Sequence, residues 1–154
     1  MSLYLVQHGK SLPKEIDPDS PLSEEGKATV HRIAQMATGY HIHVSQIIHS
    51  GKTRARQTAE IISMYIKPES GIRESTGLNP NGDVYPIAST IKGPENIMLV
   101  GHLPFMERLV SFLITGTDKH TVVKFQNGGI VCLYQDTEKE TWYIKWMVMP
   151  EMTE

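Results

Sequence analysis

Three basic side chains in this sequence stand where an apolar run gives way to a helical pattern. His8 directly follows the first such run, Arg54 opens the helical segment after the second, and His102 comes just after the most continuous run of the chain. An unprotonated imidazole can attack phosphorus and carry a phosphoryl group covalently. Arginine offers phosphoryl oxygens a planar, bidentate cation, and nearby cations keep a histidine unprotonated. Together these residue types predict phosphoryl chemistry that requires no metal.

The segments that must position these side chains alternate between two patterns. Short runs of apolar residues, typical of buried strands, cover 3–6, 44–49 and 97–100. Helical spacing of apolar residues follows each run. Ser23 is the expected cap of the first helix, Gly39 its expected stop, and Gly116 the stop of the last. We expect helices over 24–38, 52–66 and 104–114 and a weaker one over 83–92.

The last third of the chain changes character. Two strand-like runs, 130–135 and 142–148, flank the polar loop 136–140 and predict a β-hairpin. Strict alternation along the second run predicts that four large side chains point to one face of the sheet: Trp142, Ile144, Trp146 and Val148.

Strands that alternate with helices favour right-handed crossovers and the α/β class. We therefore expect one domain over residues 1–154, a three-layer α/β/α sandwich whose mostly parallel sheet carries an antiparallel C-terminal hairpin. Ligands of such sheets bind at the carboxyl ends of the strands, where helix N-termini also favour anions. His8, Arg54 and His102 should therefore meet on one rim.

Composition excludes several classes of function. The formal net charge of −2 gives no basic field for nucleic acid or an acidic membrane. No apolar stretch approaches a membrane span of about 20 residues, and the N-terminus lacks a signal-peptide pattern, so a cytoplasmic protein is expected. The lone Cys132 lies in an apolar run and is expected in the core, without a disulfide. We expect a monomer that needs no cofactor.

Four segments that contain or flank these residues resemble the motifs of the histidine phosphatase superfamily, which includes the phosphoglycerate mutases. In chain order they read LYLVQHG from Leu3, PLSEEG from Pro21, SGKTRARQTAE from Ser50 and VGHLP from Val100. The short chain and the segment LNPNGD from Leu78 are similar to the SixA-type phosphohistidine phosphatase subgroup. The resemblance implies a phosphoglycerate mutase-like fold, His8 as the nucleophile, and Arg54 and His102 as residues that hold the phosphoryl group.

The resemblance also exposes one departure. Gln7 stands where the family has an arginine, so a hydrogen-bond donor replaces a charged one. Losing one charge-assisted contact costs about 1.5–3 kcal/mol, or one to two orders of magnitude in phosphate affinity or rate. We expect Gln7 and Gly9 to line the phosphate site. Lys10 either restores the missing charge or is a surface residue.

The general acid that larger family members use has no clear counterpart. Asp83 is the first candidate and Glu74 the second, although Asp83 fits a helix cap equally well. An imidazole leaves far more easily than an alkoxide, so a missing acid favours a phosphoramidate substrate.

Three kinds of function follow from these residues. The first is a metal-independent phosphatase that acts on phosphohistidine in a protein or on a small phosphorylated molecule. The second is a non-catalytic module that binds phosphate or a phosphoprotein, with Gln7 marking lost turnover. The third, a mutase, is disfavoured because the chain is too short to close over and retain an intermediate.

Overall fold

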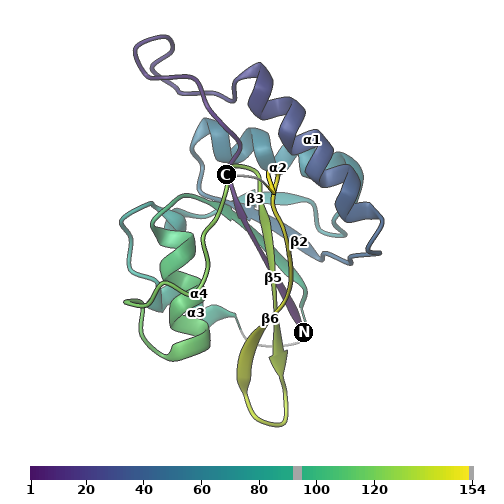
Figure 1. The fold of residues 1–154 in the computed structure, drawn as a ribbon, viewed down its shortest axis with the longest axis vertical. Helices are drawn as coiled ribbons and strands as arrows, with labels where there is room; N and C mark the ends of the chain where they lie inside the picture. Colours follow the sequence, from purple (N-terminus) through teal and green to yellow (C-terminus); the bar gives the residue numbers. More distant parts are fainter. Residues whose placement is uncertain (92–94, 153–154) are drawn as a thin grey trace.

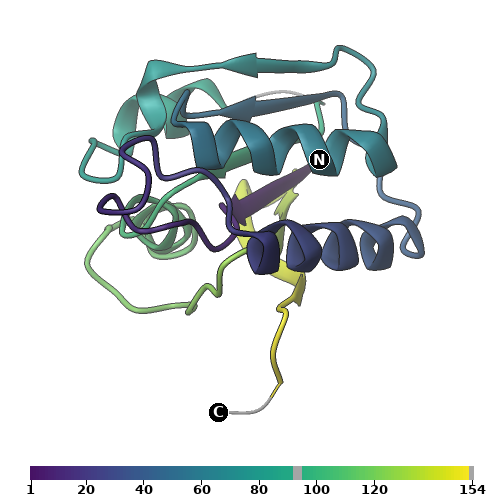
Figure 2. The same cartoon turned by 90° about the horizontal axis from the view of Figure 1, so that it is seen from above.

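The computed structural model describes residues 1–91 and 95–152, which form a six-stranded sheet with helices on both faces (Figures 1 and 2). The strand order is β3-β2-β4-β1-β5-β6. The strands are β1 (Ser2–Gln7), β2 (Gln46–His49), β3 (Ile72–Glu74), β4 (Ile97–Gly101), β5 (Ile130–Asp136) and β6 (Thr141–Val148).

The helices divide between the two faces of the sheet. Two long helices, α1 (Glu24–Thr38) and α2 (Thr53–Ile66), cover one face. The other face carries the 3₁₀ turn η1 (Thr76–Leu78), the short α3 (Tyr85–Thr90) and α4 (Phe105–Thr115). Figure 1 shows α1 and α2 together on one side and α3 and α4 on the other. The predicted three-layer α/β/α sandwich is confirmed.

The pairing of the strands matches the expected mixture. β1 pairs with β4, β4 with β2, and β2 with β3, all in parallel. β5 runs antiparallel to β1 and to β6, so the C-terminal hairpin forms one margin of the sheet as predicted. No helix among residues 1–91 and 95–152 is long and apolar enough to cross a membrane.

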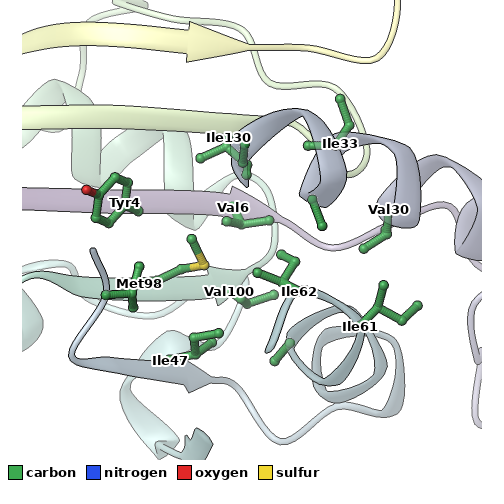
Figure 3. Close-up of a cluster of buried hydrophobic side chains, with 14 of the residues drawn as sticks. Tyr4, Val6, Val30, Ile33, Ile47, Ile61, Ile62, Met98, Val100 and Ile130 are labelled. Atoms are coloured by element: carbon green, nitrogen blue, oxygen red, sulfur yellow. The ribbon is translucent and has the colours of Figure 1, made fainter. Parts of the chain in front are cut away.

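Alternate residues of the central strands separate two cores. Tyr4 and Val6 of β1 face α1 and α2, where they pack with Val30, Ile33 and Ile62 (Figure 3). Buried Cys132 belongs to this first core. The second core lies under α3 and α4 and contains Leu3, Leu5, Leu99, Phe105 and Leu109, among others. Each central strand is therefore buried on both sides, which accounts for its continuous apolar sequence.

Local signals fix the ends of the long helices. Ser23 caps α1, where its Oγ accepts a hydrogen bond from the Gly26 N–H, and Glu24 and Glu25 occupy the first turn. Gly39 ends this helix, as predicted. Gly116 ends α4 at φ 84°, a left-handed conformation that glycine adopts without a steric penalty.

The prediction that four residues of β6 share one face is wrong. A register shift opposite Cys132 and Leu133 adds one residue to β6, so that Trp146 pairs with Cys132 while Ile144 pairs with Leu133. Trp146 and Val148 therefore pack on the core under α1 and α2, but Trp142 and Ile144 pack on the core under α4. A β-bulge of this kind reverses the facing of every later residue, which simple alternation does not anticipate.

Two further elements differ from expectation. The predicted helix over 83–92 forms only as α3, Tyr85–Thr90, and position 92 lies outside the described residues. β3 was not expected because its three residues are mostly exposed. Its pairing with β2 nevertheless adds a strand beyond β2 at the parallel edge of the sheet.

The strand ends that carry the basic residues lie side by side. Gln7 of β1 is in register with Gly101 of β4, and His49 of β2 is in register with Val100. Since these strands are parallel, their carboxyl ends open on one rim. The residues that follow them are thereby placed next to one another.

Candidate active site

The structure brings His8, Arg54 and His102 together at this rim. His8 follows β1, Arg54 lies in the first turn of α2, and His102 follows β4. The Nε–H of Arg54 donates to Nε2 of His8 over 3.3 Å. The two imidazole rings lie 4.9 Å apart between centroids. These three residues, each separated from the next by about a third of the chain, therefore form one cluster.

The contacts of the His8 ring determine which nitrogen carries the proton. Nδ1 lies 2.7 Å from the carbonyl oxygen of Gly9. A carbonyl only accepts, so Nδ1 is the protonated nitrogen and Nε2 keeps its lone pair for the Arg54 donor. The pKa of His8 is lowered to about 4, mainly because the ring is buried; the Gly9 hydrogen bond opposes this shift and the charge of Arg54 adds to it. At neutral pH His8 presents an unprotonated Nε2 beside a guanidinium.

The backbone of the His8 loop is held from three directions. The His8 N–H donates to Gly101 O over 3.0 Å, and the Asn127 side-chain amide donates to His8 O over 3.2 Å. Thr58 Oγ1 accepts from the Gly9 N–H over 3.0 Å and donates to Arg54 O over 2.7 Å. One hydroxyl of α2 thereby links the loop that carries His8 to the turn that carries Arg54.

Gly9 allows the loop after β1 to pack closely on α1, and its N–H is not available to a phosphoryl group. Its N–H is committed to Thr58, and a Cβ on Gly9 would meet the Val30 side chain at 2.7 Å. The loop after β1 therefore packs on α1 more closely than any side chain at position 9 would permit.

The segment PLSEEG, residues 21–26, also bonds to the loop that carries His8. Lys10 O accepts from the backbone N–H of Ser23 over 2.9 Å and from the Ser23 hydroxyl over 3.2 Å. Gly26 lies against the Lys10 backbone so closely that a Cβ there would collide with it. Gln57 of α2 accepts from the Leu22 N–H over 2.7 Å, which joins this motif to the third. Three motifs of the sequence thus fix the position of one loop.

His102 is the most deeply buried member of the cluster, with only 1% of its surface exposed. Its Nε2 lies 2.6 Å from Ser50 Oγ, and its Nδ1 is buried without a protein partner in residues 1–91 and 95–152. Burial is the main reason that its pKa falls to about 3, with further lowering from His8, Arg54 and Lys52. His102 is therefore a neutral hydrogen-bonding group at physiological pH.

The N-terminus of α2 adds positive potential to the site. Lys52 is its N-cap residue and makes no side-chain capping bond. Backbone N–H groups at such a terminus are available to an anion, and the helix dipole favours negative charge there. Arg54 extends from this turn and, within residues 1–91 and 95–152, its only side-chain hydrogen bond is the one from Nε to His8. Its other guanidinium N–H groups can therefore donate to an anion. The arrangement suits a phosphoryl group.

Gln7 directly precedes His8 in the chain, at the position where the resemblance to the family implies an arginine. Only 8% of its surface is exposed, and its Oε1 is buried without a protein partner in the described part of the chain. Its backbone N–H donates a hydrogen bond to Gly129 O, and its carbonyl accepts one from the Gly128 N–H. The segment before β5 therefore holds the backbone of Gln7 independently of its side chain.

Lys10 points toward a different partner. Its Nζ lies 2.9 Å from Glu25, and 60% of its side chain is exposed. Glu25 is the main cause of the raised pKa of Lys10. This placement supports the surface interpretation of Lys10 over the idea that it replaces the missing arginine.

The two candidate acids lie on exposed segments. Asp83 Oδ1 accepts from the Tyr85 N–H over 3.0 Å in the turn just before α3, whose N-cap residue is Val84 and not the predicted Asp83. Glu74 ends β3, in register with His49, and its carboxylate lies against Gly51. No hydrogen bond joins either carboxylate to His8 or His102 in the described residues.

Three supporting residues had weak or no signal in the sequence. In the sequence, Ser50 and Thr58 stand out only as members of the segment SGKTRARQTAE. Their hydroxyl contacts follow from the tertiary approach of β4 and of the His8 loop. Asn127 lies 119 residues from His8, in a turn whose sequence indicated no partner.

Comparison with known proteins agrees with this geometry. The sequence model of the histidine phosphatase superfamily (branch 1) matches residues 3–79. The phosphohistidine phosphatase SixA of Escherichia coli (strain K12) is 26% identical over 156 aligned residues, which cover 97% of this chain and 94% of the relative.

Solved structures extend the likeness to the fold. The protein histidine phosphatase SixA complexed with tungstate superposes with a TM-score of 0.82 at 26% identity, covering 97% of both chains. A phosphoglycerate mutase of Plasmodium falciparum shares the fold with a TM-score of 0.70 at 18% identity, covering 94% of this chain and 88% of that one. The chain belongs to the histidine phosphatase superfamily and is a phosphatase.

Proposed function

We propose that this phosphatase removes the phosphoryl group from phosphohistidine in proteins, with His8 as the nucleophile. The observation that carries the proposal is the fixed proton of the His8 ring. Gly9 O holds the proton on Nδ1, which leaves the Nε2 lone pair in the site beside Arg54. A lowered pKa keeps that nitrogen unprotonated at neutral pH.

The reaction then proceeds in two displacements. In the first, His8 Nε2 forms a bond to phosphorus while the P–N bond of the substrate breaks, and the departing imidazole nitrogen takes a proton from solvent. In the second, a water oxygen bonds to phosphorus and the bond to His8 breaks, which releases inorganic phosphate. Arg54 donates to the phosphoryl oxygens through both steps, and neutral His102 adds a hydrogen bond.

The nature of the leaving group favours a phosphoramidate. Asp83 is exposed and bonded to Tyr85 N, and Glu74 is exposed at the end of β3. An imidazole departs without strong acid assistance, whereas an alkoxide needs a positioned proton donor. The similarity to a phosphohistidine phosphatase over 97% of this chain supports the same substrate class. Asp83 remains the candidate acid for any activity on phosphate esters.

The experiment compares phosphate release from a histidine-phosphorylated protein with release from an aryl phosphate ester. His8→Ala is tested beside His43→Ala, which alters an exposed histidine paired with Glu69 outside the site. We expect the wild type and His43→Ala to release phosphate from the protein and to form an acid-labile, alkali-stable phosphoenzyme. His8→Ala should do neither.

Each other result identifies a different function. Release that survives His8→Ala contradicts the nucleophile. Faster release from the ester than from the phosphohistidine protein shows a small-molecule phosphomonoesterase instead. Phosphate binding without release by the wild type shows a binding module, in which the substitution at Gln7 has ended turnover.

A further inference from the structure

A hollow outside the cluster of His8, Arg54 and His102 has no part in the chemistry above. It encloses about 320 Å³. Its walls come from the loop after β1, from α1, from the segment before β5 and from the C-terminal segment: Lys10, Glu25, Thr29, Arg32, Gln126, Asn127, Pro150 and Glu151.

Two wall residues join this pocket to the active site. Lys10 lies two residues after His8, and the Asn127 side-chain amide donates to His8 O over 3.2 Å. The pocket therefore begins where the nucleophile's own loop ends. The Asn127 contact sets one wall of the pocket against the backbone of His8.

The outer wall of the pocket is fastened through its backbone. The Gln126 amide pairs with both main-chain groups of Glu151, donating to its carbonyl over 2.9 Å and accepting from its N–H over 2.8 Å. Arg32 of α1 donates to Pro150 O over 3.1 Å. Figure 2 shows this segment leaving the sheet past α1 as a yellow trace. These bonds hold the wall open and do not use the side chain of Glu151.

Of the two cations that line the pocket, Lys10 forms an ion pair and Arg32 forms none in the part of the chain that the structure describes. Lys10 is paired with Glu25 over 2.9 Å, and the charge of Glu151 also contributes to its raised pKa. Both carboxylates of the pocket therefore act on Lys10. Arg32 contacts only a backbone carbonyl, and no ion pair of this arginine occurs in the described residues. Arg32 is the cation in the pocket that is left to receive an anionic group.

We propose that this pocket binds the polypeptide next to the phosphohistidine of the substrate, with Arg32 receiving an acidic side chain of that polypeptide. The proposal rests on the proposed function, since it names how a protein substrate is distinguished from a small one. Free phosphoramidate is too small to reach the pocket from His8. A polypeptide substrate has residues on either side of its phosphohistidine that can enter the pocket, so the identity of these flanking residues should affect KM.

The test uses heptapeptides with a central N-phosphohistidine, each with one glutamate at a different flanking position, and a matching set with lysine. The non-peptide control substrate is phosphoramidate itself. Arg32→Glu is compared with Arg73→Gln, which alters an exposed arginine on β3, outside the pocket, that bonds to Gln46. An exposed ion pair contributes up to about 1 kcal/mol, so removal and reversal of one charge give about a five- to tenfold effect.

We expect at least one glutamate position to lower KM in the wild type relative to lysine. Arg32→Glu should raise KM for that peptide about five- to tenfold, reverse the preference toward lysine, and leave phosphoramidate hydrolysis unchanged. Arg73→Gln should change neither substrate. No preference at any position, or an equal loss on peptide and phosphoramidate, would overturn the proposal.

A binding measurement separates this proposal from the proposed function. Fluorescence anisotropy of the same peptides on His8→Ala reports the pocket without turnover. If the wild type releases no phosphate from any substrate, the proposed function fails, while a glutamate preference in binding that Arg32→Glu removes still supports the pocket. Active wild-type enzyme without such a preference contradicts the pocket alone.

Discussion

Replacing Gln7 with arginine tests whether one missing cation limits the rate of this phosphatase. The side chain of Gln7 is 8% exposed and lies at the end of β1, one residue before the nucleophile. Its Oε1 is buried without a protein partner in residues 1–91 and 95–152, so the native residue leaves an acceptor unsatisfied next to His8 in the chain. An arginine would remove that acceptor and add a charged donor.

The expected size of the effect follows from the added contact. A hydrogen bond to a charged group contributes about 1.5–3 kcal/mol. At about 1.4 kcal/mol for each factor of ten, Gln7→Arg should raise kcat/KM on phosphohistidine protein by about 10- to 150-fold. A guanidinium fits phosphoryl oxygens in both ground and transition states, so affinity for inorganic phosphate should rise as well.

The assay measures phosphate release at several substrate concentrations together with calorimetric binding of inorganic phosphate. Gln7→Lys supplies a charge without the planar fork and should give a smaller gain. Gln7→Met removes the amide at similar length and should raise the melting temperature, since a buried unpaired carbonyl costs about 1–3 kcal/mol. A folded Gln7→Arg enzyme that binds phosphate no more tightly than the wild type would refute the reasoning.

Three further predictions concern the groups around the nucleophile. Long-range proton–nitrogen NMR of His8 should show a protonated Nδ1 at pH 7 and no titration until the pH approaches about 4; a midpoint near 6.5 would contradict the buried, neutral ring. Thr58→Val keeps the shape of the buried side chain but frees the Gly9 N–H, so kcat should fall about tenfold, from about 1–2 kcal/mol of lost positioning, with KM nearly unchanged. An unaltered kcat would show that this bond does not position the loop. Asp83→Asn retains the acceptor for the Tyr85 N–H and removes the acid, so it should slow hydrolysis of alkyl phosphate esters but not of phosphohistidine. Equal loss on both substrates would assign Asp83 a structural role.

Much of the fold could be predicted because its long elements carry strong local signals. The runs in β1 and β4 are buried on both faces, and α1 begins at a serine that caps it. β3 carried no such signal, because its three residues are exposed or half-buried and only pairing with β2 defines the strand. The bulge in β6 is also invisible in the sequence, since it depends on how β5 pairs opposite Cys132 and Leu133.

The site also contains residues that could be predicted from the sequence and contacts that could not. The sequence was sufficient to expect that His8, Arg54 and His102 would meet, because parallel strands end on a common rim. It did not reveal that Asn127 bonds to His8 O across 119 residues, or that Ser50 bonds to His102. Such contacts depend on the separation of backbones that neither periodicity nor capping determines.

The way in which the His8 loop is held explains why the scaffold tolerates glutamine at position 7. Thr58 bonds to Gly9, Ser23 bonds to Lys10 and Asn127 bonds to His8 itself, and none of these bonds involves the Gln7 side chain. The proton on His8 Nδ1 is likewise set by Gly9 O. The position and the tautomer of the His8 ring are therefore independent of the charge at position 7. We expect a substitution there to change how strongly a phosphoryl group is held and to leave the His8 ring in place.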